Sequence, residues 1–479
     1  MNYIRMTQEP NGQMLEQLFK NHTGTPPSTI HRILTGSGSG RIYYRLADGN
    51  NSVIGTINHN RKENEAFLFL TRHFASHGLP VPRVFGVSDD RCVYIQEDFG
   101  KMSLCDHLGN PENHHNRESL LQEALMHLYG FQVRSAADLD FARCYPQPFF
   151  DKQAARWDLH YFKYMFLKPL VDEIDELTLD EAFEALLDHL FDDAFAGFMY
   201  RDFQSRNMML QHQRLWFIDY QGGRCGPLLY DVATLLYHTR LALPDELRDR
   251  LTAFYGEVLA ETFPVNQHLI AQQVHDFALL RLLQTLGAYG YRGVYQRKEA
   301  FVKPIGKALQ NTLAVLDKMS PELPVQPLKD VLTRLTPRFA DAGKSENGLV
   351  ITLNSFSYMY GLPTDDSGHG GGFVFDCRSL PNPHYEPHLR PLTGEDAPIQ
   401  QWLSEQTEVS EFLRYTEAIV VNAAEKYLDR GFDRLQVNFG CTGGKHRSVF
   451  CVEALADRLK KRGIRCDVLK NHLMLNHAQ

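Results

Sequence analysis

Apolar residues recur at helical spacing over most of the first two thirds of the sequence. One clear set at this spacing is Phe183, Leu186, Leu187 and Leu190. The first hundred residues differ, because they contain glycines and short β-like runs such as 42–46 and 93–96. The pattern predicts a small, partly β lobe over residues 1–98 and a larger, mainly helical lobe over residues 99–318.

The hydrophobic pattern changes in the last third of the chain. Prolines followed by small polar residues predict a linker over 319–347. Beyond it, an apolar strand-like run at 349–353, an alternating run at 435–439 and an amphipathic helix at 448–462 are typical of an α/β arrangement. We therefore expect a separate α/β domain over residues 348–479.

Composition narrows the class of protein. The chain has 479 residues, 43% of them hydrophobic and 23% charged, which fits a globular protein of more than one domain. Its formal net charge of −8 argues against a protein that grips nucleic acid over its whole surface. The sequence shows no secretory signal, no apolar run near the ~18 residues of a membrane helix, and no C-x-x-C pair among its cysteines. A cytoplasmic protein without membrane contact is expected.

Three polar residues form the first candidate site. Asp202 is followed five positions later by Asn207, and Asp219 comes twelve positions after Asn207, behind an apolar strand-like run at 215–218. Phosphoryl transfer requires a carboxylate that orients the attacking hydroxyl and accepts its proton, and oxygen ligands for the Mg²⁺ that bridges the phosphates. Asp and Asn are also common in ordinary turns. The hairpin spacing favours a site, with Asp202 as the base and Asn207 and Asp219 as metal ligands.

The string 200–231 resembles the catalytic and metal-binding segment of the aminoglycoside phosphotransferase and choline kinase superfamily. The resemblance covers about residues 20–315 and is closest to bacterial kinases that phosphorylate N-acetylmuramic acid and N-acetylglucosamine at the anomeric hydroxyl. It implies a bilobal, protein-kinase-like α+β fold, ATP and Mg²⁺ as cofactors, and an amino sugar or related metabolite as the acceptor. It also implies the roles given above to Asp202, Asn207 and Asp219.

The sequence departs from this family at two places. Tyr200 stands where the family usually has His. The strand expected to carry the phosphate-gripping lysine, Ser52–Asn58, contains no lysine, and Arg61 or Lys62 could replace it. Without such a cation the domain would be a nucleotide-sensing pseudokinase, part of a regulatory adaptor whose second domain binds RNA or protein. The intact base and metal ligands argue against that alternative, because a scaffold needs no metal ligands.

Two further segments would bind the nucleotide in a domain of this type. A glycine-rich loop precedes the strand-like run at 42–46, and its residues are Gly36, Ser37, Gly38, Ser39 and Gly40. Such a run alone is more often a flexible turn, but at the start of the small lobe its N–H groups can approach phosphate, because no Cβ intervenes at glycine. Residues 96–100, with Glu97, resemble the hinge between lobes, where backbone groups meet adenine.

The C-terminal part contains a second candidate site, a turn between the strand-like run at 435–439 and the helix from 448. Such a turn collects unpaired N–H groups at the positive end of a helix, where anions bind. The predicted members of this anion site are Thr442, Gly443, Gly444, Lys445, His446, Arg447 and Ser448. The turn is not a Walker A loop, because His446 stands where Ser or Thr should hold Mg²⁺.

Cys441 and Arg447 leave a different chemistry open for this turn. Their C-x₅-R spacing, followed by Ser448, matches the loop of cysteine phosphatases, in which a helix N-terminus lowers the thiol pKa and the arginine binds phosphate. Gly440 stands where those enzymes usually have His. Phosphatase catalysis is therefore the less favoured alternative.

A second resemblance rests on five segments of the last third, 349–356, 360–363, 375–384, 389–394 and 440–448. They resemble the C-terminal domain of RapZ, an RNase adaptor whose C-terminal domain binds small RNAs and senses glucosamine-6-phosphate. Together they cover nearly all of residues 348–472. The resemblance implies a site for a phosphorylated amino sugar, lined by His384, Thr442, Gly443, Lys445, His446 and Arg447. The N-terminal P-loop domain of RapZ is replaced here by the kinase-like domain, so an RNA partner stays an open alternative.

Overall fold

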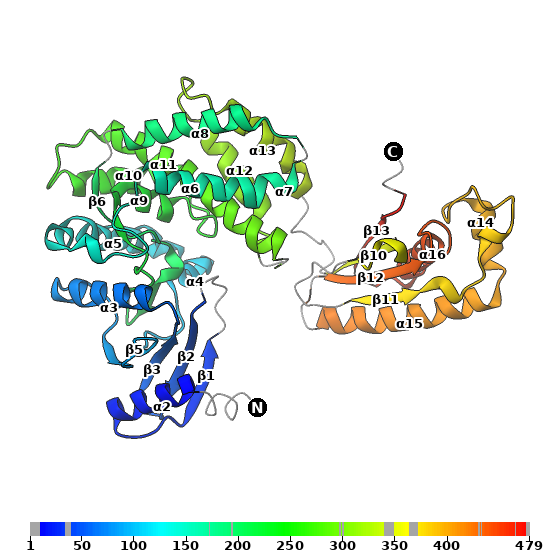
Figure 1. Ribbon diagram of the computed structural model, residues 1–479, viewed down its shortest axis with the longest axis horizontal. Helices are drawn as coiled ribbons and strands as arrows, with labels where there is room; N and C mark the ends of the chain where they lie inside the picture. Colours follow the sequence, from blue (N-terminus) through cyan, green and yellow to red (C-terminus); the bar gives the residue numbers. More distant parts are fainter. Residues whose placement is uncertain are drawn as a thin grey trace. The chain divides into compact units, whose positions relative to one another are not determined.

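The structure is a computed structural model, and it describes residues 10–33, 40–171, 173–192, 195–296, 298, 301–339, 349–363, 372–429, 432, 434–464 and 466–475. Its contacts divide the protein into two compact units, Met1–Arg292 with Pro304–Pro337 and Gly293–Lys303 with Arg338–Gln479 (Figure 1). The cysteines of the chain are free thiols. Among the described helices, none is long and apolar enough to cross a membrane.

The first unit begins with an antiparallel sheet of strand order β1-β2-β3-β5-β4. The strands are β1 (Thr29–Ile33), β2 (Ile42–Ala47), β3 (Ser52–Ile57), β4 (Val84–Val87) and β5 (Val93–Glu97). Helix α2 (Pro10–Thr23) packs against this sheet through the fully buried Leu15 and Phe19. Helix α3 (Arg61–Ser76) connects β3 to β4, and the side chain of Asn60 caps its first turn.

The second lobe of this unit is mainly helical. Its helices are α4 (Leu104–Gly109), α5 (Arg117–Tyr129), α6 (Lys152–Phe162), α7 (Lys168–Leu170), α8 (Glu176–Phe191), α9 (Leu228–Leu236), α10 (Asp245–Leu259), α11 (Gln267–Tyr289), α12 (Ile305–Leu316) and α13 (Gln326–Phe339). Helix α11 packs against α6, α9, α10 and α12. Short antiparallel pairs join β6 (Ala196–Met199) to β9 (Arg224–Pro227) and β7 (Met208–Gln211) to β8 (Arg214–Phe217). A sheet lobe followed by a helical lobe confirms the predicted bilobal fold.

Part of the segment predicted as a linker, 319–347, is helical. Helix α13 lies within it and belongs to the first unit as far as Pro337. The buried leucines of α13 recur at helical spacing and are Leu328, Leu332 and Leu335. Their burial holds the helix together although Pro337 lies near its end. The predicted linker is therefore too long at its start, and its remainder, 340–347, lies outside the described residues.

The second unit is built on a parallel sheet of strand order β11-β12-β10-β13. Its elements are β10 (Val350–Ser357), β11 (Phe373–Asp376), α14 (Ala397–Ser404), α15 (Thr407–Asp429), β12 (Arg434–Cys441), α16 (Arg447–Arg462) and β13 (Asp467–His472). Parallel strands need crossover connections, which α15 and α16 provide (Figure 1). The unit confirms the predicted α/β domain. Ligands of such sheets bind outside the carboxyl ends of the strands, where the turn after β12 lies.

Candidate functional site

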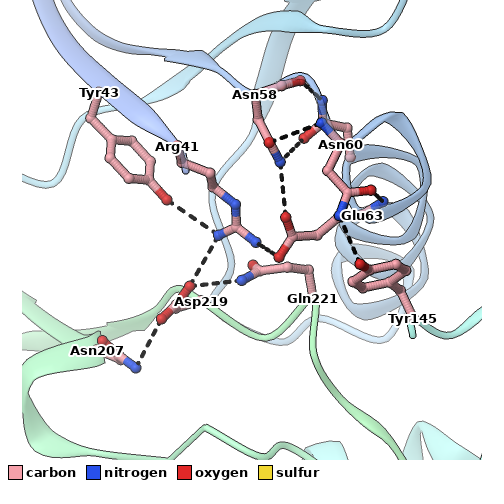
Figure 2. Close-up of polar contacts among 10 residues, drawn as sticks. Arg41, Tyr43, Asn58, Asn60, Glu63, Tyr145, Asn207, Asp219 and Gln221 are labelled. Atoms are coloured by element: carbon pink, nitrogen blue, oxygen red, sulfur yellow. Dashed lines mark hydrogen bonds and ion pairs between the residues drawn. The ribbon is translucent and has the colours of Figure 1, made fainter. Parts of the chain in front are cut away.

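Asp202, Asn207 and Asp219 lie together in the first unit. Asp202 and Asn207 belong to the loop between β6 and β7, and Asp219 follows β8. The hairpin pairs Met208 with Phe217 and so returns the chain to this loop. As a result the Asn207 amide lies 3.4 Å from Asp219 Oδ2 and donates to the Asp202 carbonyl oxygen at 3.0 Å. Figure 2 shows Asn207 pointing at Asp219.

Arg201 and Asp219 both have backbone in the left-handed region, with φ of 83° and 71°. Residues other than glycine cost on the order of 1–3 kcal/mol there and persist only where surrounding contacts hold them. The Ile218 N–H donates to the Asn207 carbonyl oxygen at 3.0 Å. Arg201 donates two hydrogen bonds to the Asp158 carboxylate, each of 2.8 Å. These contacts hold the strained backbone on both sides of the site.

Asp202 has the surroundings of an ionised carboxylate. Its Oδ1 accepts hydrogen bonds from Gln204 Nε2 at 2.9 Å and from Arg281 Nη2 at 3.3 Å. Burial opposes ionisation, but the guanidinium groups of Arg281, Arg206 and Arg201 and the bond from Gln204 together hold the pKa of Asp202 below its ordinary value. The carboxylate is therefore charged at neutral pH and can accept a proton.

The loop is fixed from behind by Asp231 and Tyr200. Asp231 is fully buried on α9 and accepts the N–H groups of Tyr200 at 2.6 Å and Arg201 at 3.0 Å, and Gln132 Nε2 at 2.8 Å. Burial raises the pKa of this carboxyl to about 7 in spite of these bonds. The Tyr200 hydroxyl donates to the Ile218 carbonyl oxygen at 2.8 Å. Tyr200, at the position where the family usually has His, thus links the two halves of the site.

Replacing Asp231 by Ala should destabilise the first unit. The change leaves two backbone N–H groups and the Gln132 amide buried without this acceptor, and each unsatisfied group costs about 1–3 kcal/mol. We expect urea denaturation to show a loss of more than about 2 kcal/mol in the free energy of unfolding. The exposed Asp249→Ala is the control and should stay within about 0.5 kcal/mol of wild type. A loss no larger than that of the control would contradict the bracing role.

Arg41 supplies a cation that the sequence analysis did not assign. It directly precedes β2, and its side chain is only 4% exposed. Its Nη1 donates to Asp219 Oδ1 at 3.1 Å and to the Tyr43 hydroxyl at 3.2 Å, and its Nη2 pairs with Glu63 on α3 (Figure 2). Glu63 also accepts a hydrogen bond from Asn58 Nδ2 at 2.9 Å. The Arg41 guanidinium therefore joins a carboxylate of the small lobe to one of the large lobe.

Arg61 and Lys62, suggested above as replacements for the missing lysine, begin helix α3. They line a cavity of about 660 Å³, whose other lining residues include Arg72, Arg91, Arg143 and Tyr145. Arg61 Nε donates to Glu65 at 3.1 Å. Residues four apart share a helix face, whereas Glu63 is two positions from both Arg61 and Glu65 and points elsewhere. The contacts with Glu63 and Asp219 are made by Arg41, and phosphate binding by Arg61 or Lys62 stays a prediction.

The structure describes only part of the predicted nucleotide-binding segments. Outside the described residues lie Gly36, Ser37, Gly38 and Ser39. Gly40 is exposed, and no described atom lies within 4 Å of a Cβ placed on it. Glu97 ends β5, but its carboxylate pairs with Arg83 at 3.0 Å and its N–H donates to the Arg83 carbonyl oxygen at 2.9 Å. The Glu97 N–H is therefore bonded within the small lobe, and the contact of backbone groups of 96–100 with adenine stays a prediction.

The turn after β12 brings predicted anion-binding residues to one edge of the second unit. Exposed at this turn are Thr442, Gly443 and Lys445. The rings of His384 and His446 lie 6.2 Å apart between centroids, so the distant His384 also reaches the turn. Gly444 has a φ of 68°, and a Cβ on it would lie 2.4 Å from Met474. Only glycine fits there.

Arg447 and Ser448 are buried beneath this turn. Arg447 Nη1 donates to the carbonyl oxygens of Arg378 at 2.9 Å and Leu380 at 3.0 Å. Its guanidinium therefore fixes the segment after β11, and the predicted contact of Arg447 with an anion stays a prediction. Cys441 is also buried, with its Sγ 3.2 Å from the Ser448 hydroxyl oxygen. The spacing of a cysteine phosphatase is present, but its arginine is bonded elsewhere.

Comparisons with known proteins match two separate parts of the chain, one within each unit of the structure. Residues 31–264 match the phosphotransferase enzyme family, and residues 349–474 match the RapZ C-terminal domain. A nucleotide-binding protein of Aeromonas hydrophila is 41% identical over 121 residues, which are 25% of this chain and 40% of that protein. The RNase adapter protein RapZ of Serratia proteamaculans is 40% identical over 143 residues, 30% of this chain and 46% of that protein. The chain thus spans less than half the length of these two curated relatives.

Solved structures that align with the chain include choline kinase LicA from Streptococcus pneumoniae, with a TM-score of 0.45, 12% identity and coverage of 63% of this chain and 99% of that one. A thermostable mutant of aminoglycoside phosphotransferase APH(4)-Ia aligns with a TM-score of 0.44 and 16% identity, over 63% and 98% of the two chains. The family matches confirm both resemblances predicted from the sequence. By these matches, residues 31–264 are similar to the phosphotransferase enzyme family and residues 349–474 are similar to the RapZ C-terminal domain.

Proposed function

We propose that the first unit transfers the γ-phosphoryl group of ATP to a hydroxyl of an amino sugar or related metabolite. The observation that carries this proposal is the convergence of the ionised Asp202 and Asn207, on the loop between β6 and β7, with Asp219, which follows β8. The family match over residues 31–264 supports the reaction class. The amino-sugar acceptor rests on the sequence resemblance.

In the proposed reaction, Asp202 orients the acceptor hydroxyl and takes its proton. The acceptor oxygen forms a bond to the γ-phosphorus, and the bond from that phosphorus to the bridging oxygen of the departing ADP breaks. Asp202 must be ionised beforehand, and the charges around it keep it so. The hydrogen bonds of Asp231 and Tyr200 keep the loop, and with it the carboxylate, in one position.

The side chains around Asp219 fit Mg²⁺. This ion prefers carboxylate and amide oxygens. Asn207 lies beside the Asp219 carboxylate, with its Nδ2 3.4 Å from Asp219 Oδ2, so the Asn207 ligand would be its side-chain oxygen. These two residues would hold the ion, whose charge would offset that of the phosphates. The cluster therefore supports a Mg²⁺-dependent reaction.

A screen for phosphoryl transfer tests the proposal. The full-length protein is mixed with Mg²⁺ and ATP labelled at the γ-phosphate, and with single acceptors: N-acetylmuramic acid, N-acetylglucosamine, other amino sugars, amino alcohols and nucleosides. We expect label on a sugar hydroxyl, with the Asp202→Asn protein as the control for contaminating kinases. ATP binding without transfer to any acceptor would favour the nucleotide-sensing pseudokinase, the alternative suggested by the absence of a lysine on β3.

For the second unit we propose a site for a phosphorylated amino sugar at the turn after β12. The turn precedes the N-terminus of α16, whose N–H groups and dipole attract anions. The exposed Lys445 adds charge, and His384 approaches from another segment. The RapZ C-terminal domain match supports the assignment. Because Arg447 is bonded to carbonyl oxygens, we assign it to the fold of the turn.

Lys445→Ala and Arg447→Ala should separate ligand binding from folding. Lys445→Ala should weaken glucosamine-6-phosphate binding about tenfold, through loss of one charge-assisted contact, and leave the unfolding temperature unchanged. Arg447→Ala should lower the stability of the second unit by about 1–3 kcal/mol, because two carbonyl oxygens lose their donor. Calorimetry and thermal unfolding of the full-length protein measure both effects. Unchanged affinity in Lys445→Ala would contradict the site, and phosphate-ester hydrolysis that is lost in Cys441→Ser would favour the phosphatase.

A further inference from the structure

Arg41 lies between the two lobes of the first unit, where it contacts groups from three segments. Glu63 of α3 binds one end of its guanidinium, and Asp219 and the Tyr43 hydroxyl accept from the other (Figure 2). Glu63 is itself held by Asn58. With 4% of its side chain exposed, Arg41 has a fixed position and direction, unlike a solvated surface arginine.

Strand register explains how a side chain next to β2 reaches a place that a lysine on β3 was expected to fill. Strands β2 and β3 are antiparallel, and Tyr43 lies opposite Thr56. Residues directly opposite share a face of the sheet, and so do residues two apart along a strand. Arg41, Tyr43 and Thr56 therefore face the same side. Thr56 is therefore the β3 position opposite Tyr43, on the face that Arg41 shares.

We propose that Arg41 is the cation that binds the nucleotide phosphates in this protein, in place of a lysine on β3, and that Glu63 orients it. This inference rests on the kinase function proposed above. A guanidinium presents planar N–H donors that can bind two phosphate oxygens at once, whereas an ammonium acts as a point charge. Arg41 already contacts Asp219, the carboxylate proposed to hold the metal, so its donors lie beside the place where the phosphates must bind.

In its contact with Asp219, Arg41 competes with a metal ion for the same carboxylate oxygen. Asp219 Oδ1 accepts hydrogen bonds from Arg41 Nη1 at 3.1 Å and from Gln221 Nε2 at 2.7 Å. Lone pairs that accept these bonds are not available to a metal ion at the same time. Metal binding at this oxygen therefore requires Arg41 to turn away from Asp219 while Glu63 keeps hold of its other end. The phosphates provide the new acceptors, so loss of Arg41 should affect metal-free ATP and Mg²⁺ alone in opposite directions.

The Arg41→Ala and Arg41→Gln variants test the inference through binding affinities, which can be measured without turnover. Calorimetry with ATP and EDTA should show about 10- to 100-fold weaker binding, the range for loss of charge-assisted hydrogen bonds. Calorimetry with Mg²⁺ alone should show at least about fivefold tighter binding, because a competing cation is removed. Arg41→Lys should keep most of the ATP affinity. Thr56→Lys in the Arg41→Ala background should restore part of it.

Arg61→Ala is the matched control, because Arg61 pairs with Glu65 and lines the separate cavity; both affinities should stay at the wild-type value. A structural tether alone predicts that loss of Arg41 lowers both affinities or neither, and either result overturns the inference. Should the Arg41→Ala and Arg41→Gln proteins fail to fold, the guanidinium ¹⁵N–¹H signal of Arg41 in the wild-type protein decides. It must shift on addition of ATP, and an unmoved signal overturns the inference. A wild-type protein that binds no ATP would instead overturn the kinase proposal, and this inference with it.

Discussion

Asp202→Asn is expected to lower the rate of phosphoryl transfer about 10²- to 10⁴-fold, the usual effect of losing a general base. Asn has nearly the shape of Asp, and its side-chain oxygen can still accept from Gln204 Nε2, so the loop should keep its conformation. It cannot take the proton of the acceptor hydroxyl. ATP affinity measured by calorimetry should stay close to the wild-type value, because Asp202 acts on the acceptor and not on the nucleotide.

Arg281→Gln is the companion variant, since it keeps the base but changes its pKa. Burial already pushes the pKa of Asp202 upward, and Arg281 is the strongest of the charges that hold it down. Its loss should raise that pKa. Because the base works only when ionised, the acidic limb of the pH profile of kcat/KM should move to higher pH. Near-normal turnover by Asp202→Asn, or an acidic limb that does not move in Arg281→Gln, would remove Asp202 from the role of base.

The cluster of Asp202, Asn207 and Asp219 could be predicted from the sequence because its geometry is local. A two-stranded hairpin pairs residues close in the chain, so the spacing of Asn207 and Asp219 around it is enough to place them side by side. The spacing of apolar residues, helical in some segments and strand-like in others, likewise predicted both lobes and the α/β unit. Such features depend on backbone periodicity, which the sequence displays directly.

Arg41 could not be predicted in this way. It is 178 positions from Asp219 in the chain, and their contact depends on how the small lobe packs on the large one. The signal in the sequence was a single arginine directly after the glycine-rich loop, and its spacing did not show the contact with Glu63 that the structure reveals. A cation expected on β3, or just after it at Arg61, leaves out the residue that precedes the neighbouring strand β2.

The C-x₅-R spacing of the second unit shows what a local motif leaves undetermined. Spacing sets where the Cα atoms of Cys441 and Arg447 lie on the turn and the helix, but not the direction of the side chains. The carbonyl oxygens of Arg378 and Leu380 come from a segment more than sixty residues earlier, and they decide where the guanidinium points. The spacing therefore predicts the helix N-terminus, but it does not predict which groups the Arg447 guanidinium binds.

Asp219→Asn is expected to remove the Mg²⁺ dependence of ATP binding and to slow transfer about 10²- to 10³-fold. A bound metal stabilises charge in the transition state by several kcal/mol, and each ~1.4 kcal/mol corresponds to a factor of ten. Asn is the informative replacement because Asp219 has a φ of 71°. Asn tolerates this left-handed conformation better than Ala does. The variant therefore removes one negative charge with little change in the backbone.

Calorimetry of ATP with and without Mg²⁺ measures the effect. In the wild-type protein Mg²⁺ should strengthen ATP binding, and in Asp219→Asn the two affinities should converge. Metal-free ATP should bind Asp219→Asn at least as tightly as wild type, because Arg41 no longer has a charged carboxylate that competes with the phosphates. Gln221→Ala is the control, since it removes the other donor to Oδ1 and keeps the carboxylate, so Mg²⁺ should still strengthen binding. An Asp219→Asn protein with the full Mg²⁺ enhancement would show that the metal is held by other residues.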